Sequence, residues 1–297
     1  MKEYDIIIIG AGPAGLTAGL YAERQGSKTL ILEKDTIGGL GKQIARMENY
    51  PGFEEISGIE LIEKMKNQLK KTEIKEFENV ESIIKKENKF EVNTINKQYL
   101  TKSIILATGS AHKNLNVKGE EEFKGRGVSY CATCDGLFFQ NKKIIVAGGG
   151  NTAIQEALFL KNLGCNVTII HKRNKLQADK ALQEKINNIN VILKSEIIEI
   201  KGETVVTSII IKNKNEIKEI PTDWIFISTD YKTNNELSKE LNLKLNETNH
   251  IITDKNQKTN IPYVYAAGDI CDELKQWVVA CAHGAIAATS AYHDLNL

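Results

Sequence analysis

The sequence has no apolar run long enough to cross a membrane. Its longest wholly apolar stretches, such as residues 6–9, 144–147 and 277–282, are far short of the roughly 18 residues that a spanning helix needs. The N-terminus carries Lys2 before two acidic residues and enters a strand-like run at once, unlike the charged start and longer apolar core of a signal peptide. We therefore expect no membrane contact and a cytoplasmic location.

The chain also lacks an excess of charge of either sign. Its 39 Lys and Arg residues are balanced by 38 Asp and Glu residues, for a net charge of +1. Because no overall electrostatic field attracts a polyanion, we expect no nucleic-acid partner.

Cysteine is scarce and odd in number, which argues against a secreted disulfide framework. Of the five cysteines, Cys165, Cys271 and Cys281 are isolated, and buried packing is their expected role. Cys131 and Cys134 form a C-x-x-C pair. No second pair of Cys or His residues at ligand spacing accompanies it, so we expect no metal site. In a reducing compartment this pair needs a chemical explanation.

The length and composition suit two domains, since 297 residues with 41% hydrophobic content can supply two cores. Two segments, residues 6–33 and 143–170, read as strand, glycine turn, helix and strand. Two such units far apart in the chain predict an α/β fold with two Rossmann-like dinucleotide-binding domains.

Three glycines follow the first strand at the spacing of a dinucleotide-binding turn. The first makes the turn, the second lets a pyrophosphate approach the backbone, and the third lets helix and strand pack closely. The helix that follows points unpaired N–H groups at the phosphates, and an acid ends the second strand where the ribose contact is expected. A purely structural turn is the alternative. The residues assigned to this site are Gly10, Gly12, Pro13, Ala14, Gly15 and Glu33.

A second glycine turn has the same spacing, with alanine in the third position. The residues after its second strand are basic rather than acidic, which favours a ribose carrying a 2′-phosphate, as in NADPH. A solvated basic loop is the alternative. The residues assigned to this nucleotide site are Gly148, Gly150, Asn151, Thr152, Ala153, His171, Lys172 and Arg173.

The pair Cys131 and Cys134 lies just before the second glycine unit. Two thiols at this spacing can close a small reversible disulfide, and a turn or helix start favours the reactive thiolate form. Asp135 follows at once, and either exchanges protons with a thiol or begins the turn at Gly136. The pair indicates disulfide exchange.

Several segments together resemble one known family, the low-molecular-weight thioredoxin reductases of bacteria. The most specific match is FKGRGVSYCATCDG at residues 123–136, followed by GGGNTAIQEA at residues 148–157. Residues 48–52, 107–109 and 266–269 look like the remaining flavin-domain signatures of that family, and the resemblance covers nearly the whole chain.

This resemblance implies that the second domain is inserted into the first. FAD-binding segments are expected at residues 1–112 and 244–297, with an NAD(P)H-type domain carrying the C-x-x-C pair at 113–243. The family also implies a homodimer and a rotation of one domain on the other. The further FAD contacts that it implies are Asn49, Thr108, Gly109, Gly268, Asp269, Lys275, Gln276 and Trp277.

The activity that the resemblance implies is thioredoxin-disulfide reduction, in which FAD passes two electrons from NADPH to the Cys131–Cys134 disulfide. By analogy, Cys134 faces the flavin, Cys131 attacks the disulfide of thioredoxin, and Asp135 is the acid and base.

Four positions depart from the family pattern. Lys172 and Gln177 stand where the family has arginines, so the bidentate fork is lost at one position and the charge at the other. Asp230 adds a negative charge, and Trp277 replaces a small residue beside the flavin contact, where an indole stacks on the flavin or packs in the core. These departures leave a non-NADPH donor such as ferredoxin as an alternative, and a flavin-binding redox sensor without turnover as an alternative of another class.

Overall fold

The protein, seen in a computed structural model, is described at all residues except 45–46, 133–138, 215, 230, 273 and 297. Cys134, Asp135 and Asp230 therefore lie outside the described residues. The chain folds as two compact units. Unit 1 comprises Met1–Lys42, Met47–Ala111 and Thr233–Leu297, and unit 2 comprises Gln43–Arg46 and His112–Lys232. Within the described residues, no helix is both long and apolar enough to span a bilayer.

Unit 1 is built on a mostly parallel sheet. Its strands are β1 (Lys2–Ile9), β2 (Thr29–Leu32), β3 (Glu73–Lys75), β4 (Val80–Lys85), β5 (Phe90–Thr94), β6 (Gln98–Leu106) and β17 (Val264–Ala266). They pair in the order β3-β2-β1-β6-β5-β4, with β17 also paired to β6, and only the β4–β5 and β5–β6 pairs are antiparallel. The four isoleucines of β1 are at most 5% exposed, as expected for a strand covered on both faces.

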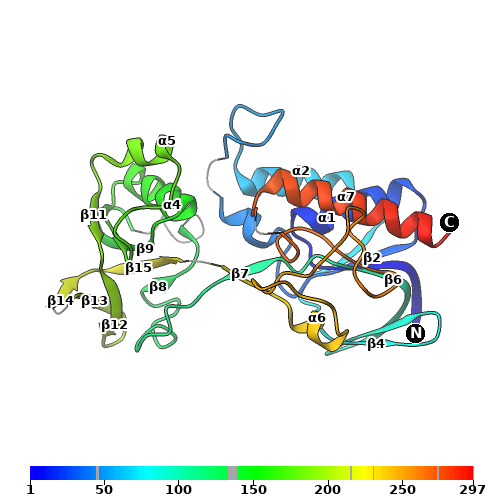
Figure 1. Cartoon of the computed structure of the whole chain (residues 1–297). Helices are drawn as coiled ribbons and strands as arrows, with labels where there is room; N and C mark the ends of the chain where they lie inside the picture. Colours follow the sequence, from blue (N-terminus) through cyan, green and yellow to red (C-terminus); the bar gives the residue numbers. More distant parts are fainter. Residues whose placement is uncertain (45–46, 133–138, 215, 230, 273, 297) are drawn as a thin grey trace. The chain divides into compact units, whose positions relative to one another are not determined.

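The helices of unit 1 are α1 (Pro13–Arg24), α2 (Gly58–Gln68), α6 (Glu236–Glu240) and α7 (Trp277–Asp294), and a short 3-10 helix spans Gly39–Gln43. Helix α7 lies along α1 (Figure 1). A Cβ atom at Gly284 of α7 would lie 2.1 Å from the backbone oxygen of Ala14 in α1. The small residues of α7 therefore let the C-terminal helix close over the helix that follows the first glycine turn.

Residues 233–243 belong to unit 1, whereas the sequence prediction ends the inserted domain at residue 243. The physical reason is hydrophobic burial. Leu237 and Leu241 of α6 and Leu243 after it pack in the same core cluster as Val80 and Phe90 of the unit 1 sheet.

Unit 2 carries a second, fully parallel sheet in the order β11-β10-β9-β15-β8, and a three-stranded antiparallel sheet in the order β12-β13-β14. The helix α4 packs on β9 and β10. The elements are β8 (Val128–Ser129), β9 (Lys143–Gly148), α4 (Asn151–Asn162), β10 (Asn166–His171), α5 (Lys180–Gln183), a 3-10 helix (Glu184–Ile186), β11 (Asn190–Leu193), β12 (Glu196–Gly202), β13 (Val206–Asn213), β14 (Glu216–Pro221) and β15 (Trp224–Ser228). The short strands β7 (Ser110–His112) and β16 (Tyr231–Thr233) pair with each other.

Each unit therefore contains a parallel or mostly parallel sheet in which one strand, β1 or β9, is followed by a glycine turn and a helix. The predicted α/β class with two Rossmann-like sheets is confirmed.

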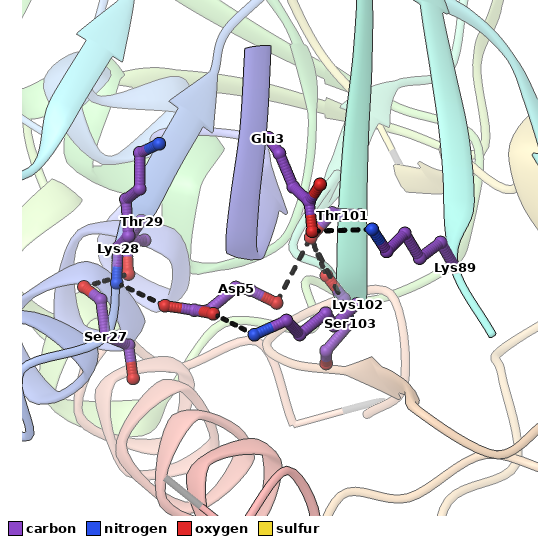
Figure 2. A network of polar contacts seen from close by, with 9 residues as sticks. All are labelled: Glu3, Asp5, Ser27, Lys28, Thr29, Lys89, Thr101, Lys102 and Ser103. Atoms are coloured by element: carbon purple, nitrogen blue, oxygen red, sulfur yellow. Dashed lines mark hydrogen bonds and ion pairs between the residues drawn. The ribbon is translucent and has the colours of Figure 1, made fainter. Parts of the chain in front are cut away.

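A polar network holds β1 between its neighbours at the end of the strand away from Gly10. Figure 2 shows the Asp5 carboxylate between the backbone N–H of Lys28 and the ammonium group of Lys102, at 2.9 and 2.7 Å. Burial opposes the charge on Asp5, but these two donors outweigh it and hold the pKa of Asp5 below its ordinary value. Glu3 pairs with Lys89 at 2.8 Å. Side-chain contacts thus hold the start of β1, whereas the end of β1 leads directly into the glycine turn at Gly10.

Glu23 near the end of α1 ties down the chain after α2, which makes the stability of unit 1 sensitive to acid. Its carboxylate accepts backbone N–H groups of Lys70, Lys71 and Thr72 at 2.8–3.1 Å. Burial opposes the charge, but the N–H groups outweigh it and lower the pKa of Glu23 to about 2. A lowered folded-state pKa means that the stabilisation is complete above the ordinary value of 4.5 and is lost as the pH falls toward about 2.

We therefore expect Glu23→Gln to lower the urea midpoint of unfolding at pH 6, and this deficit to shrink progressively between pH 4.5 and pH 2. Glu63→Gln, which removes an exposed carboxylate from α2, is the matched control and should leave the urea midpoint unchanged at both pH 6 and pH 2. A Glu23→Gln deficit of equal size at pH 6 and pH 2 would contradict this account.

Candidate functional site

The first glycine turn has the geometry that its sequence predicts. Gly10 adopts a φ of +106°, and a Cβ atom there would lie 2.3 Å from the backbone oxygen of Ala107. A Cβ atom at Gly15 would lie 1.9 Å from the backbone oxygen of Gly10. A Cβ atom at Gly12 would meet nothing within 4 Å. Gly10 and Gly15 are therefore required by packing, whereas Gly12 borders open space.

Open space at Gly12 coincides with the N-terminus of α1. Gly12 is the N-cap residue, makes no side-chain cap, and precedes Pro13 at the first helical position. Such a helix start presents N–H groups and the positive end of the helix dipole to an anion. These residues fit the pyrophosphate of FAD.

Glu33 is held in place at the end of β2. It is 7% exposed, and its two carboxylate oxygens accept the backbone N–H groups of Ala11 at 2.7 Å and Asp35 at 3.0 Å. A carboxylate has further lone pairs after two such bonds. It therefore fits a ribose hydroxyl donor beside the glycine turn.

Four more predicted FAD residues come from distant segments of unit 1. Gly268, with a φ of +81°, packs against Ala14 at the start of α1, where an added Cβ would lie 2.9 Å from the Cβ of Ala14. The Asp269 carboxylate accepts the Ser110 hydroxyl at 2.9 Å. Thr108 and Asn234 exchange two hydrogen bonds of 2.8 Å, and Gly109 has a φ of +63°.

The start of α7 contributes the last predicted FAD contacts. Gln276 is its N-cap residue, and the Gln276 side-chain oxygen accepts the Asn49 amide at 3.0 Å. Trp277 is 8% exposed and packs over Gly41, where an added Cβ would lie 2.8 Å from the indole. The Tyr50 ring lies edge-on to the indole at 6.3 Å. These contacts are those of a packed core side chain at the beginning of a helix.

The second glycine turn, in unit 2, repeats the first. A Cβ atom at Gly148 would lie 2.1 Å from the backbone oxygen of Ser228 and 2.8 Å from the Cβ of Ala153, whereas at Gly150 it would meet nothing within 4 Å. Gly150 is the N-cap residue of α4 and makes no side-chain cap. A phosphate group fits here for the same reason as at Gly12.

The three basic residues at the end of β10 and just after it do not form one exposed cluster. His171 is 7% exposed and its ring packs against Gly149, 2.5 Å from where a Cβ would lie, because the residue still belongs to the strand. Lys172 and Arg173 are exposed. Of the three, Lys172 and Arg173 are therefore the ones placed as surface cations for a 2′-phosphate.

Two side chains that the sequence did not indicate lie at the start of α4. Asp179 exchanges two 2.8 Å hydrogen bonds with Asn151. The hydroxyl groups of Tyr231 and Thr152 lie 3.1 Å apart. Asn151, one of the residues predicted to bind the nucleotide, is thus hydrogen-bonded to the Asp179 carboxylate. No local sequence pattern reveals either contact, because both partners are far away in the chain.

Cys131 takes part in a disulfide bond. It is 8% exposed, and its backbone N–H donates to the Ser129 hydroxyl at 3.1 Å. Its predicted partner Cys134 and the predicted acid Asp135 lie outside the described residues. Cys165, Cys271 and Cys281 are free thiols. Burial raises the pKa of all three, for Cys271 to about 12, so none of them is primed as a thiolate.

Comparison with known proteins decides the family. A family model for pyridine nucleotide-disulphide oxidoreductases matches residues 4–284. A thioredoxin reductase of Treponema pallidum (strain Nichols) is 39% identical over 297 residues, covering 97% of this chain and 96% of the relative. The chain belongs to the low-molecular-weight thioredoxin reductase family.

Two further relatives also match this chain over nearly its whole length. A crystal structure of T. acidophilum thioredoxin reductase has a TM-score of 0.94 and 36% identity, with 100% of both chains covered. A Clostridium pasteurianum relative named "34.2 kDa protein in rubredoxin operon" is 38% identical over 298 residues, covering 98% of this chain and 96% of the relative. The chain is therefore a thioredoxin reductase-like flavoprotein disulfide reductase, and the family implies binding of FAD and a pyridine nucleotide.

Proposed function

We propose that the protein is a thioredoxin-disulfide reductase that uses FAD to carry two electrons from NADPH to the Cys131–Cys134 disulfide and on to thioredoxin. The observation that carries the proposal is the disulfide at Cys131, in a chain whose described cysteines elsewhere are free thiols. Two glycine turns with open space at the phosphate-binding position support the two nucleotide cofactors. We also expect a homodimer in the cytoplasm.

In this proposal unit 1 binds FAD through the α1 N-terminus and Glu33, and unit 2 binds the nucleotide at the α4 N-terminus. Bound FAD supplies a two-electron carrier between a nicotinamide and a disulfide. The fixed glycine turns and the buried Glu33 hold their ligands without reorganisation, because their own backbone contacts already define their positions.

The thiol steps follow the residue assignments of the family. The thiolate of Cys131 attacks one sulfur of the thioredoxin disulfide, a mixed disulfide forms, and the other thioredoxin sulfur leaves as a thiolate. Asp135 supplies a proton to the departing sulfur. Cys134 then attacks the Cys131 sulfur, which releases reduced thioredoxin and restores the Cys131–Cys134 disulfide.

A second candidate keeps the thiol chemistry but replaces NADPH by a low-potential protein donor such as ferredoxin. Burial of His171 and the Asp179–Asn151 contact favour this candidate, because fewer cations and one more carboxylate surround the α4 N-terminus. Anaerobic mixing of the oxidised protein with NADPH, NADH or reduced ferredoxin separates the two. Bleaching of the flavin band near stoichiometric NADPH supports the first, and bleaching by ferredoxin alone supports the second.

The exposed cations also give a direct test of nucleotide choice. We expect Arg173→Ala to weaken NADP⁺ binding about tenfold, through loss of a charge-assisted contact to the 2′-phosphate, and to leave NAD⁺ binding unchanged. Lys175→Ala, at another exposed cation of the same loop, is the matched control for general electrostatics. Calorimetric titration measures both. Equal weakening by the two substitutions would show that no specific 2′-phosphate contact exists at Arg173.

A further inference from the structure

Glu156 is a buried acid that the proposed reaction does not use. It lies on the inner side of α4 and is 5% exposed. The hydroxyl group of Ser228, at the end of β15 and 6% exposed, donates to Oε2 of Glu156. The other oxygen, Oε1, is buried and forms no further well-formed hydrogen bond among the described residues. Such a group is costly to keep charged and needs an explanation.

Among the residues that the structure describes, no cation pairs with Glu156. The core cluster around α4 is apolar, with the thiol of Cys165 as its titratable member. Other titratable groups on the elements packed against α4 are His171, which is buried against Gly149, and the exposed Lys143, Lys180, Glu184 and Lys185. Burial raises the pKa of Glu156 to about 7, while the Ser228 hydroxyl and the backbone N–H of Ala132 favour its charged form.

Ala132 connects this acid to the redox sulfur. It is completely buried and follows Cys131 directly, and its backbone N–H faces the Glu156 carboxyl group. Covalent geometry then limits the Glu156 carboxyl to within about 9 Å of the Cys131 sulfur. A charge on either group therefore raises the proton affinity of the other, since both residues and the intervening Ala132 are buried.

We infer that Glu156, held by Ser228, is a proton-holding group behind Cys131 that takes up a proton when the disulfide is reduced. Glu156 acts through Cys131 and is a positioning residue, because its side chain is buried. The inference rests on the proposed disulfide exchange at Cys131 and adds the group that sets its proton balance.

The step balances as follows. A two-electron reductant, such as a dithiol, breaks the S–S bond of Cys131. One sulfur becomes a thiolate, the other takes one proton from water and becomes a thiol, and the Glu156 carboxylate takes a second proton from water. The buried site thus holds one negative charge before and after reduction, rather than two.

The test measures the titration of the Cys131 thiol in the full-length chain with Cys134→Ser, so that Cys131 has no partner within the pair. Alkylation by iodoacetamide proceeds through the thiolate, and peptide mass spectrometry counts the Cys131 adduct at each pH from 5 to 9. In the Cys134→Ser chain, which is the parent for the variants below, the alkylation rate should rise with pH in two steps, because the Cys131 thiol and the Glu156 carboxyl titrate as a coupled pair. Adding Glu156→Gln should give one step at lower pH, with an alkylation rate at pH 7 about tenfold higher.

Glu184→Gln, which removes an exposed carboxylate from the same unit, is the matched control and should superimpose on the parent. Ser228→Ala is the independent second variant. Without the hydroxyl, Glu156 stays protonated to higher pH, so the rate at pH 7 should rise part of the way and match the parent at pH 9. If neither Glu156→Gln nor Ser228→Ala shifts the profile relative to Glu184→Gln, the inference is overturned. Because the assay requires no turnover, its outcome is independent of whether thioredoxin is the acceptor.

Discussion

Replacing Cys131 by serine should abolish thioredoxin turnover while sparing everything upstream of the disulfide. We expect the Cys131→Ser chain to bind FAD normally and to have its flavin bleached by the donor, but to reduce thioredoxin about 10³-fold more slowly or worse, since no mixed disulfide can form at this position. Insulin precipitation coupled to thioredoxin measures turnover, and stopped-flow absorbance measures flavin reduction.

The control for this experiment is Cys165→Ser in the same unit. Cys165 is a buried free thiol that donates to the backbone oxygen of Phe139 at 3.1 Å, and a serine hydroxyl can replace that bond. Turnover should persist in this variant. If the Cys131→Ser chain keeps its turnover, electrons do not pass through Cys131. If it keeps its flavin but changes only its affinity for a partner protein, the sensor alternative gains support.

The second large effect separates the packing role of the glycine turn from its binding role. Gly15→Ala places a Cβ atom 1.9 Å from the backbone oxygen of Gly10, so α1 and β1 must move apart and the loss of stability should reach about 3 kcal/mol or more. The Cβ atom that Gly12→Ala adds has no neighbour within 4 Å, so this substitution should leave the urea midpoint of the FAD-free chain unchanged. The methyl group instead enters the space proposed for the pyrophosphate, so FAD affinity should fall about tenfold or more.

Gly150→Ala is the matched control for Gly12→Ala, because a Cβ atom there also meets nothing within 4 Å. It should leave FAD affinity unchanged and weaken pyridine-nucleotide binding instead. Fluorescence titration of the FAD-free chain gives both constants. Unchanged FAD affinity in Gly12→Ala would mean that the pyrophosphate lies elsewhere.

The sequence predicted the parts of the site that rest on local backbone geometry. The close approach of Gly15 to Gly10 and of Gly148 to Ala153 follows from the glycine spacing alone, since strand, turn and helix are neighbours in the chain. The position of Glu33 at the end of β2 follows from the length of the same unit.

What the sequence did not reveal depends on contacts between distant segments. The inserted unit ends earlier than predicted because the leucines of α6 and of the chain after it pack in the unit 1 core. His171 is a basic residue in the sequence but a core residue in the fold. The sequence does not distinguish Glu156 from the other acids in its helices. Its contact with the Ser228 hydroxyl depends on how β15 packs beside α4.

One anaerobic experiment tests the central claim most directly. The purified protein is reduced with one equivalent of donor per bound flavin, and oxidised thioredoxin is added without further donor. We expect the yellow flavin absorbance to return and two new thiols to appear on thioredoxin for each equivalent of donor that was added. A chain that holds no flavin, or a reduced flavin that stays reduced while thioredoxin remains a disulfide, would contradict the account.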